Sequence, residues 1–203
     1  MPAKSIALPL LFRTYTVREN SGYNCRIWEA ARATSAAPTF FKRIAITENG
    51  LREEFIDAGL GCNNPVMRVL EEARHAFGPT RPLACVVSIG TGQAATIGLP
   101  TPDAFQRLLP LNLINVLKGI ATNCEEVAEV CERRYREVDN FYFRFNVEQG
   151  MQNITLAEWG KLDETMQHTR QYLQKETVTK RINTVVEVLQ AQPAVITTAE
   201  ISM

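Results

Sequence analysis

Residues 55–65 read FIDAGLGCNNP, and this stretch decides the fold that the sequence predicts. An acidic residue, Asp57, follows a short apolar run and precedes small residues, among which glycine lets backbone segments approach closely. In α/β proteins a carboxylate placed in this way lies at the carboxyl edge of the sheet, where catalysis is one use for it. The same spacing also fits a structural turn, in which Asp57 binds nearby amides while Asn64 caps the next helix. The pattern therefore predicts a strand, a loop and a helix, and it leaves both uses of Asp57 open.

The composition excludes several classes of protein. Of the 203 residues, 45% are hydrophobic and 22% are charged, as in globular proteins large enough to bury a core. The 22 Lys and Arg balance the 22 Asp and Glu and form no cluster, so nucleic acid is not an expected partner. The longest apolar runs, residues 6–12 and 83–89, are too short to cross a bilayer.

The cysteine count and the first residues both bear on the compartment. Five cysteines form no CxxC pair and leave one over if bridged, which indicates reduced thiols rather than disulfides. The first residues lack the basic segment and apolar core of a signal peptide. We therefore expect a cytoplasmic protein.

Hydrophobic periodicity predicts alternating strands and helices, and therefore an α/β fold. An Asn49-Gly50 pair predicts a hairpin, Asn24 is a candidate helix cap, and residues 83–89 predict a strand buried on both faces, as in a parallel sheet. Residues 140–147 alternate between aromatic and polar side chains, which predicts a half-buried strand. The expected strands are 9–17, 43–47, 54–57, 83–89 and 140–147, and the expected helices are 26–37, 65–77, 113–138 and 156–189 with a break near Thr177.

Three motifs carry a resemblance to a known family. Residues 28–41 read WEAARATSAAPTFF, residues 55–60 read FIDAGL with Asn-Asn-Pro soon after, and residues 87–92 read VSIGTG. In this order and with these gaps they closely resemble the patatin-like phospholipase family. A later segment, residues 142–147, reads YFRFNV and looks like the end of the fungal-type members. Further matching positions in that region are Ile154, Leu156, Trp159, Leu162 and 169–173.

The resemblance covers residues 10–173 and implies a fold. We expect an α/β protein that forms the C-terminal portion of a patatin-like three-layer fold with a mainly parallel central sheet. Residues 1–175 would be the C-terminal part of the patatin-like domain, residues 176–192 a terminal helix, and residues 193–203 a tail.

The resemblance also implies a chemistry. Members of the family are acyl-ester hydrolases with a Ser–Asp dyad: a serine on a GxSxG turn, an aspartate in a DG[GA] motif, and a glycine-rich oxyanion loop upstream. Asp57 matches the aspartate that accepts the proton, in the motif Asp57-Ala58-Gly59, where Ala58 stands in place of the usual glycine. The 203 residues contain no GxSxG and no GGGxxG-like loop. The resemblance therefore implies a chain that carries the base without the nucleophile and is inactive alone, with lipid or acyl-ester substrates if the missing N-terminal half is present.

No residue of the chain is a strong candidate for the missing nucleophile. None of the five serines, at positions 5, 21, 35, 88 and 202, lies on a predicted tight strand-to-helix turn that would activate a hydroxyl. Cys62 follows Asp57 by five residues, but no histidine accompanies it, and it is expected to fill the loop.

The sequence predicts no metal and no cofactor. His75 and His168 have no second ligand three or four residues away. Residues 90–95 imitate a dinucleotide-binding fingerprint, but the helix that should follow is missing. The apolar stripe of 113–138 is expected to be core rather than a lipid pocket.

Two alternatives stay open beside the hydrolase. The chain could be a noncatalytic scaffold or interaction domain that descends from the family, or a truncated fragment. Loss of the first strands would open one edge of the central sheet, which predicts self-association. Peripheral contact with a membrane is a further partner hypothesis.

Overall fold

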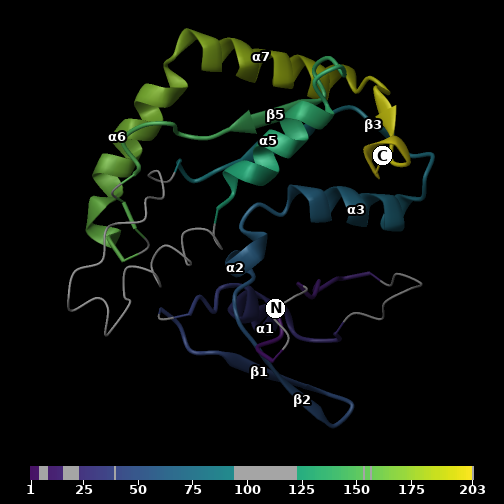
Figure 1. Ribbon diagram of the computed structural model, residues 1–203, viewed down its shortest axis with the longest axis vertical. Coiled ribbons are helices and arrows are strands. Elements are labelled where there is room, and N and C mark those ends of the chain that lie inside the picture. Colours follow the sequence, from purple (N-terminus) through teal and green to yellow (C-terminus); the bar gives the residue numbers. More distant parts are fainter. Residues whose placement is uncertain are drawn as a thin grey trace, which may run out of the picture. The chain divides into compact units, whose positions relative to one another are not determined.

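The computed structural model describes residues 1–4, 9–15, 23–38, 40–93, 123–152, 154–155 and 157–202 (Figure 1). These residues divide into two units. Unit 1 comprises the described residues up to Asn63 together with Asn123, and unit 2 comprises those of 64–93 and 124–202. Each unit is described by itself below.

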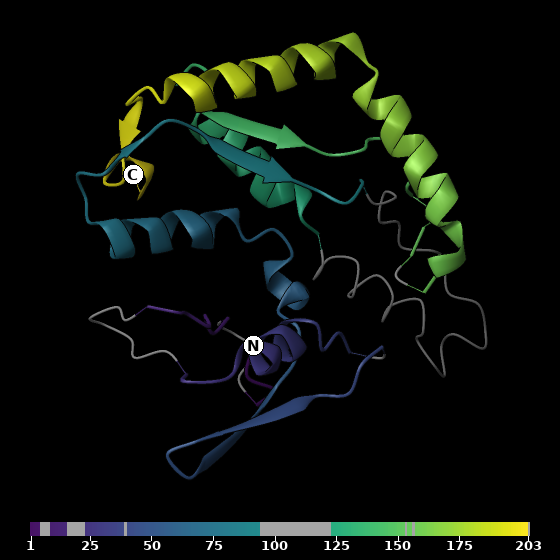
Figure 2. The ribbon, with the colours of Figure 1, turned by 180° about the vertical axis from the view of Figure 1, so that it is seen from behind.

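Unit 1 is built around a hairpin. Strand β1 (Ile44–Glu48) pairs antiparallel with β2 (Leu51–Phe55), as Figure 2 shows. Asn49 and Gly50 connect the strands with φ angles of 49° and 80°, the left-handed conformations that a two-residue turn requires. The predicted hairpin is confirmed, with β2 beginning three residues earlier than expected. The helices of unit 1 are α1 (Ile27–Thr34) and the short, kinked α2 (Gly59–Cys62).

The aromatic core of unit 1 forms against one face of this hairpin. Phe55 is fully buried, and the rings of Phe12 and Tyr23 meet it edge-on with centroids 5.4 and 5.3 Å away. The strand predicted for residues 9–17 is wrong for residues 9–15, which form no strand; residues 16 and 17 lie outside the described part. Leu10 and Phe12 pack their side chains into this core instead.

The start of α1 differs from the prediction. The helix begins at Ile27, and the Glu29 side chain accepts a hydrogen bond from the Arg26 amide at 2.8 Å, which satisfies one exposed donor of the first turn. Asn24 is therefore not the cap; its amide donates to Glu48. α1 also ends at Thr34, three residues before the predicted end.

Unit 2 contains one parallel and one antiparallel pair of strands. β4 (Val86–Ile89) pairs parallel with β5 (Tyr142–Phe145), and β3 (Pro82–Leu83) pairs antiparallel with β6 (Ile196–Thr197). The other elements are α3 (Val66–Phe77), α5 (Glu125–Arg134), η1 (Trp159–Lys161), α6 (Leu162–Leu173), α7 (Glu176–Ala191) and η2 (Glu200–Ser202).

Helices pack against both faces of β5. Tyr142 packs with α3 and α5 around buried Phe141, whereas Phe145 packs with Tyr172 of α6 and Val178 of α7. Successive side chains of a strand point to opposite faces, so these two clusters lie on opposite sides of β5. Figures 1 and 2 both show α7 along one side of the two strands. Strand β5 is therefore enclosed by helices on both sides.

Two predictions for residues 83–89 need correction. The apolar run is divided between β3 and β4, because Ala84 and Cys85 belong to neither strand. The run is also not buried on both faces, since Val87 is exposed and Ile89 is 77% exposed. In the described part of the chain only β5 pairs with β4. The structure is thus a mixed α/β protein with two-stranded sheets, and β4–β5 is its one parallel pairing among the described residues.

The helical predictions hold best for α3. It begins after Pro65, the Asn64 Oδ1 atom accepts a hydrogen bond from the Val66 amide at 3.3 Å, and Gly78 follows its end. Of the helix predicted for 113–138, residues 125–134 form α5, and residues 113–122 lie outside the described part. The break predicted near Thr177 is found at Gln174 and Lys175, between α6 and α7. No helix of the described residues has the length and hydrophobicity to cross a membrane.

The carboxyl-terminal residues, expected to form a tail, contain β6 and η2. The Thr198 amide donates to the Arg81 carbonyl at 2.9 Å, next to the β3–β6 pair. Ile201 is 1% exposed and joins the core of α3 and α5, where its carbonyl accepts a hydrogen bond from the Tyr135 hydroxyl. The segment is therefore part of the core of unit 2.

Candidate functional site

Asp57 lies in the loop between β2 and α2. Its backbone amide donates to the Ala36 carbonyl at 3.1 Å, which ties the loop to the residues after α1. The Oδ1 atom accepts a hydrogen bond from the Gly59 amide at 2.7 Å, the geometry of a turn closed by an aspartate side chain. The carboxylate is half-buried. Asp57 thus has the structural use that its spacing predicted, and its partial exposure leaves it accessible to a proton donor.

The residues after Asp57 make a tight loop for identifiable reasons. Ala58 has φ −81° and ψ 0°, a conformation open to any residue, so alanine in place of the usual glycine costs the backbone little. A side chain at Gly59 would place a carbon 3.3 Å from the Asp57 Oδ1 atom, which favours glycine there. Gly61 has φ 102°, a value that side chains disfavour.

The candidate nucleophiles among the described residues lie in α2, directly after α1, in β4 and in η2. Cys62 is half-buried in α2, Ser35 is exposed and donates to the Ala31 carbonyl, and Ser88 is buried in β4. Ser202 lies in η2, and serines 5 and 21 lie outside the described residues. Of the described serines, none lies on a tight turn from a strand into a helix.

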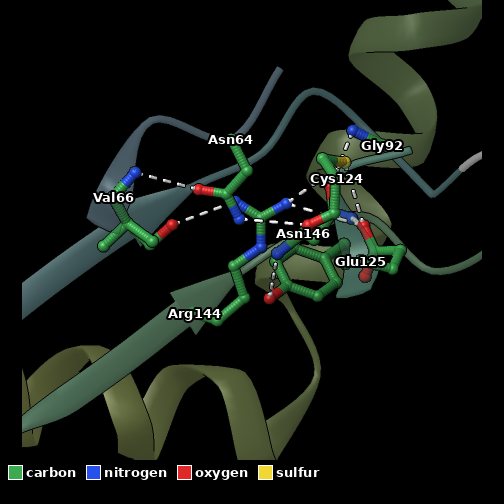
Figure 3. Close-up of polar contacts among 9 residues, drawn as sticks. Asn64, Val66, Gly92, Cys124, Glu125, Arg144 and Asn146 are labelled. Atoms are coloured by element: carbon green, nitrogen blue, oxygen red, sulfur yellow. Dashed lines mark hydrogen bonds and ion pairs between the residues drawn. The ribbon is translucent and has the colours of Figure 1, made fainter. Parts of the chain in front are cut away.

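A polar cluster in unit 2 was not identified from the sequence (Figure 3). Arg144 of β5 is 8% exposed at its side chain, and its Nη1 atom donates to the Ser88 Oγ atom of β4 at 3.0 Å. Its Nη2 atom lies 3.6 Å from the Glu125 Oε1 atom and 3.7 Å from the Cys124 Sγ atom. The guanidinium therefore joins the two parallel strands to the start of α5.

Asn146 extends this cluster to the turn after β4. Its Nδ2 atom donates to the Glu125 Oε1 atom at 2.9 Å, and its Oδ1 atom accepts from the Gly92 amide at 2.8 Å. The Gly90 amide donates to the Phe145 carbonyl at 2.8 Å. The amides of Gly90 and Gly92, in the stretch that imitates a dinucleotide-binding fingerprint, are thus hydrogen-bonded within the chain rather than directed at a phosphate. Residues 94 and 95 of that stretch lie outside the described part.

Asn64 connects the cluster to α3. It donates through Nδ2 to the Cys124 carbonyl at 3.1 Å, and its Oδ1 atom accepts a hydrogen bond from the Val66 amide at the start of α3. The N-cap of α3 is Pro65, one residue after the predicted cap at Asn64. Burial is the largest cause that raises the pKa of the Cys124 thiol, and the hydrogen bond to Glu125 adds to it. The thiol is therefore neutral and a poor nucleophile. The cluster holds the start of α3, the start of α5 and the turn after β4 together.

The alternating pattern of residues 140–147 led to a wrong prediction for the polar residues of this cluster. Arg144 and Asn146 alternate with Phe143 and Phe145, which predicted a solvated face for the polar residues. Arg144 is instead buried, because helices cover both faces of β5. A charged residue within an otherwise apolar strand could have suggested a buried ion pair.

The described residues contain no group of three or more His, Cys, Asp or Glu that could hold a metal ion. His75 is exposed, and His168 lies 3.8 Å from Glu164 through its Nε2 atom. The acidic and thiol groups of the polar cluster bind Arg144 and Asn146 instead of converging on one point.

Fold and site together define a mixed α/β protein with an aspartate presented directly after a strand. Its sequence is 35% identical over 156 residues to calcium-independent phospholipase A2-gamma of Rattus norvegicus, which is 76% of this chain and 19% of that protein. It is 30% identical over 162 residues to patatin-like phospholipase 1 of Plasmodium falciparum, 68% of this chain and 23% of that protein. Patatin-like protein 3 of Arabidopsis thaliana is 33% identical over 100 residues, 41% of this chain and 23% of that protein.

The chain belongs to the patatin-like phospholipase family. It spans about a fifth of the length of the curated relatives it matches. No family model matches the chain, and no solved structure matches it.

Proposed function

We propose that this chain is the C-terminal part of a patatin-like acyl-ester hydrolase that acts on lipid esters, and that Asp57 is its catalytic base. The similarity to proteins named phospholipases supports the substrate class. The observation that carries the role of Asp57 is its presentation: a half-buried carboxylate, directly after a strand, in a loop made tight by Gly59.

In this proposal the nucleophilic serine and the oxyanion loop come from residues upstream of those in the chain, since the 203 residues contain no GxSxG. The serine hydroxyl attacks the acyl carbonyl while Asp57 accepts its proton, and upstream glycine amides stabilise the oxyanion. The turn that uses the Oδ1 atom for the Gly59 amide orients the carboxylate so that Oδ2 is the atom to accept the proton. No metal or cofactor takes part.

The same proposal extends to the fold and the compartment. The parallel pairing of β4 with β5 and the helices on both faces of β5 support a three-layer fold with a mainly parallel central sheet. Free thiols at all five cysteines support a cytoplasmic location, because disulfides are rare there.

The proposal is tested by labelling with a fluorophosphonate, which reacts with activated serines, in cells that make the protein. A labelled species heavier than 22.8 kDa that contains peptides of this chain supports the hydrolase. An unlabelled native species of 22.8 kDa contradicts it and favours a noncatalytic interaction domain, the second candidate, which the absence of GxSxG also favours.

The role of Asp57 has its own test in the complete protein. Replacing Asp57→Asn keeps the side-chain oxygen that binds the Gly59 amide but removes the base, so we expect turnover to fall by about 10²–10⁴-fold. Asp139→Asn is the matched control, because Asp139 is exposed and far along the chain from the loop. Activity that survives Asp57→Asn at the level of Asp139→Asn would exclude Asp57 as the base.

A further inference from the structure

The outer surface of unit 2 carries a row of exposed apolar side chains along η1 and α6. Trp159 is 83% exposed and Leu162 is 64% exposed, and Met166 and Leu173 are also exposed. At 100° per residue, Leu162, Met166 and Leu173 lie within about 40° of arc on one face of α6. We call these four residues the α6 stripe.

The packed side of α6 is centred on Tyr172, about 100° around the helix from Leu173. Tyr172 is buried against Val147 and Val178, and the hydroxyls of Thr165 and Thr169 donate to carbonyls one turn earlier in the chain. Tyr172 thus anchors α6 in unit 2, and the α6 stripe occupies a neighbouring, exposed side of the same helix. The stripe is not needed to hold the helix in place.

The charges around the α6 stripe balance. Residues 158–175 contain three acidic and three basic side chains, not counting histidine. Lys161 pairs with Glu158 at 2.6 Å, and Lys175 pairs with Glu148 at 2.9 Å. Arg170 is exposed about 40° around the helix from Met166, where its guanidinium can bind a phosphate oxygen. This surface matches a zwitterionic lipid headgroup layer better than an anionic one.

We propose that the α6 stripe docks unit 2 on a zwitterionic phospholipid surface. Trp159 lies at the level of the headgroups, which its amphipathic ring favours, and Leu162, Met166 and Leu173 enter the acyl boundary. The choice of a lipid surface rests on the proposed function, because a lipid-ester hydrolase meets its substrate there. The docking itself requires no turnover and is measured without it.

Trp159 provides the probe for the test. The chain has two tryptophans, so Trp28→Phe in the 203-residue chain leaves Trp159 as the single emitter. With phosphatidylcholine vesicles we expect a blue shift of its emission, quenching by brominated phosphatidylcholine, and co-sedimentation that changes little with salt. Replacing both Leu162→Ser and Met166→Ser should weaken the partition by about tenfold or more.

Leu51→Ser is the matched control. Leu51 is 66% exposed, close to the 64% of Leu162, but it lies on the hairpin of unit 1. Its partition should equal that of the Trp28→Phe chain. Circular dichroism establishes that each variant is folded.

Three results would overturn the proposal. The folded chain could leave the vesicles unbound with no change in Trp159 emission, or bind only anionic vesicles and release them in salt. Size-exclusion chromatography could also show a dimer that Leu162→Ser with Met166→Ser dissociates, which would make the stripe a contact between two copies.

Failure of the docking and failure of the proposed function are distinguishable. Asp57→Asn in the 203-residue chain should leave vesicle partition unchanged, because Asp57 is not in the α6 stripe. Partition lost with the stripe variants while hydrolysis by the complete protein survives Asp57→Asn supports the docking and contradicts the catalytic role. If Asp57→Asn abolishes hydrolysis and the protein does not bind vesicles, the catalytic role is supported and the docking is contradicted.

Discussion

Replacing Arg144→Ala should destabilise unit 2 more than removing any exposed arginine. The side chain is 8% exposed and makes a 3.0 Å hydrogen bond to Ser88 and a 3.6 Å ion pair with Glu125. A hydrogen bond to a charged group contributes about 1.5–3 kcal/mol, and breaking a buried pair costs about 3–5 kcal/mol. Because Glu125 is itself 30% exposed and water can solvate it, we take the lower end and expect a loss of about 3 kcal/mol in the free energy of unfolding.

Urea unfolding followed by circular dichroism measures this loss, with Arg68→Ala as the matched control. Arg68 pairs with Glu71 at 3.0 Å on the exposed face of α3, so the control also deletes one arginine of one ion pair. Exposed pairs contribute about 1 kcal/mol or less. If Arg144→Ala costs no more than Arg68→Ala, Arg144 is not the connection between β4, β5 and α5 that its contacts indicate.

A double-mutant cycle keeps the test valid if Arg144→Ala unfolds the chain. Arg144→Met retains much of the side-chain volume, and Glu125→Gln removes the partner charge. We expect the double variant to lose less free energy of unfolding than the two single variants lose together. The reason is that Arg144→Met alone leaves the Glu125 carboxylate without its cation, whereas the double variant has no such carboxylate. Strict additivity would contradict an energetic coupling between Arg144 and Glu125.

Two further predictions follow from burial in unit 2. Ile201→Ala should lower the free energy of unfolding by about 2–5 kcal/mol, measurable by urea unfolding, because Ile201 is 1% exposed in the core; a loss near zero would mean that the carboxyl-terminal segment is not docked. Burial is the largest cause that raises the pKa of the Cys131 thiol, so the folded chain retains this proton at a pH where the unfolded chain has lost it. The contribution of Cys131 to stability should therefore hold up to about pH 8.5 and fall as the pH rises further. Alkylation of Cys131 by iodoacetamide should be slow in the absence of urea. Rapid alkylation of the folded chain would refute this.

Local sequence signals predicted the elements that local interactions form. The Asn49-Gly50 pair adopts positive φ angles at little cost, so the hairpin could be placed from two residues. Asn64 and Gly78 bound α3 for similarly local reasons: the Asn64 side chain accepts a hydrogen bond from the Val66 amide, and Gly78 has a positive φ of 77°. The motif around Asp57 was also recognisable, because the loop depends on small residues next to each other in the chain.

The burial of side chains was decided by tertiary structure. Arg144 and Asn146 occupy the polar positions of an alternating strand, and the sequence alone could not indicate that helices cover that face as well. The partner of Arg144 at Ser88 is 56 positions away in the chain, and the Tyr135 hydroxyl meets the Ile201 carbonyl 66 positions away.

The sequence by itself determined the family, the hairpin, α3 and the loop that presents Asp57, since each depends on neighbouring residues and their backbone preferences. Tertiary structure alone decided the division of residues 83–89, the docking of Ile201 and the exposure of the α6 stripe. The physical reason is that the exposure of a side chain depends on which distant elements pack against it, and hydrophobic periodicity reports only which face of an element is apolar.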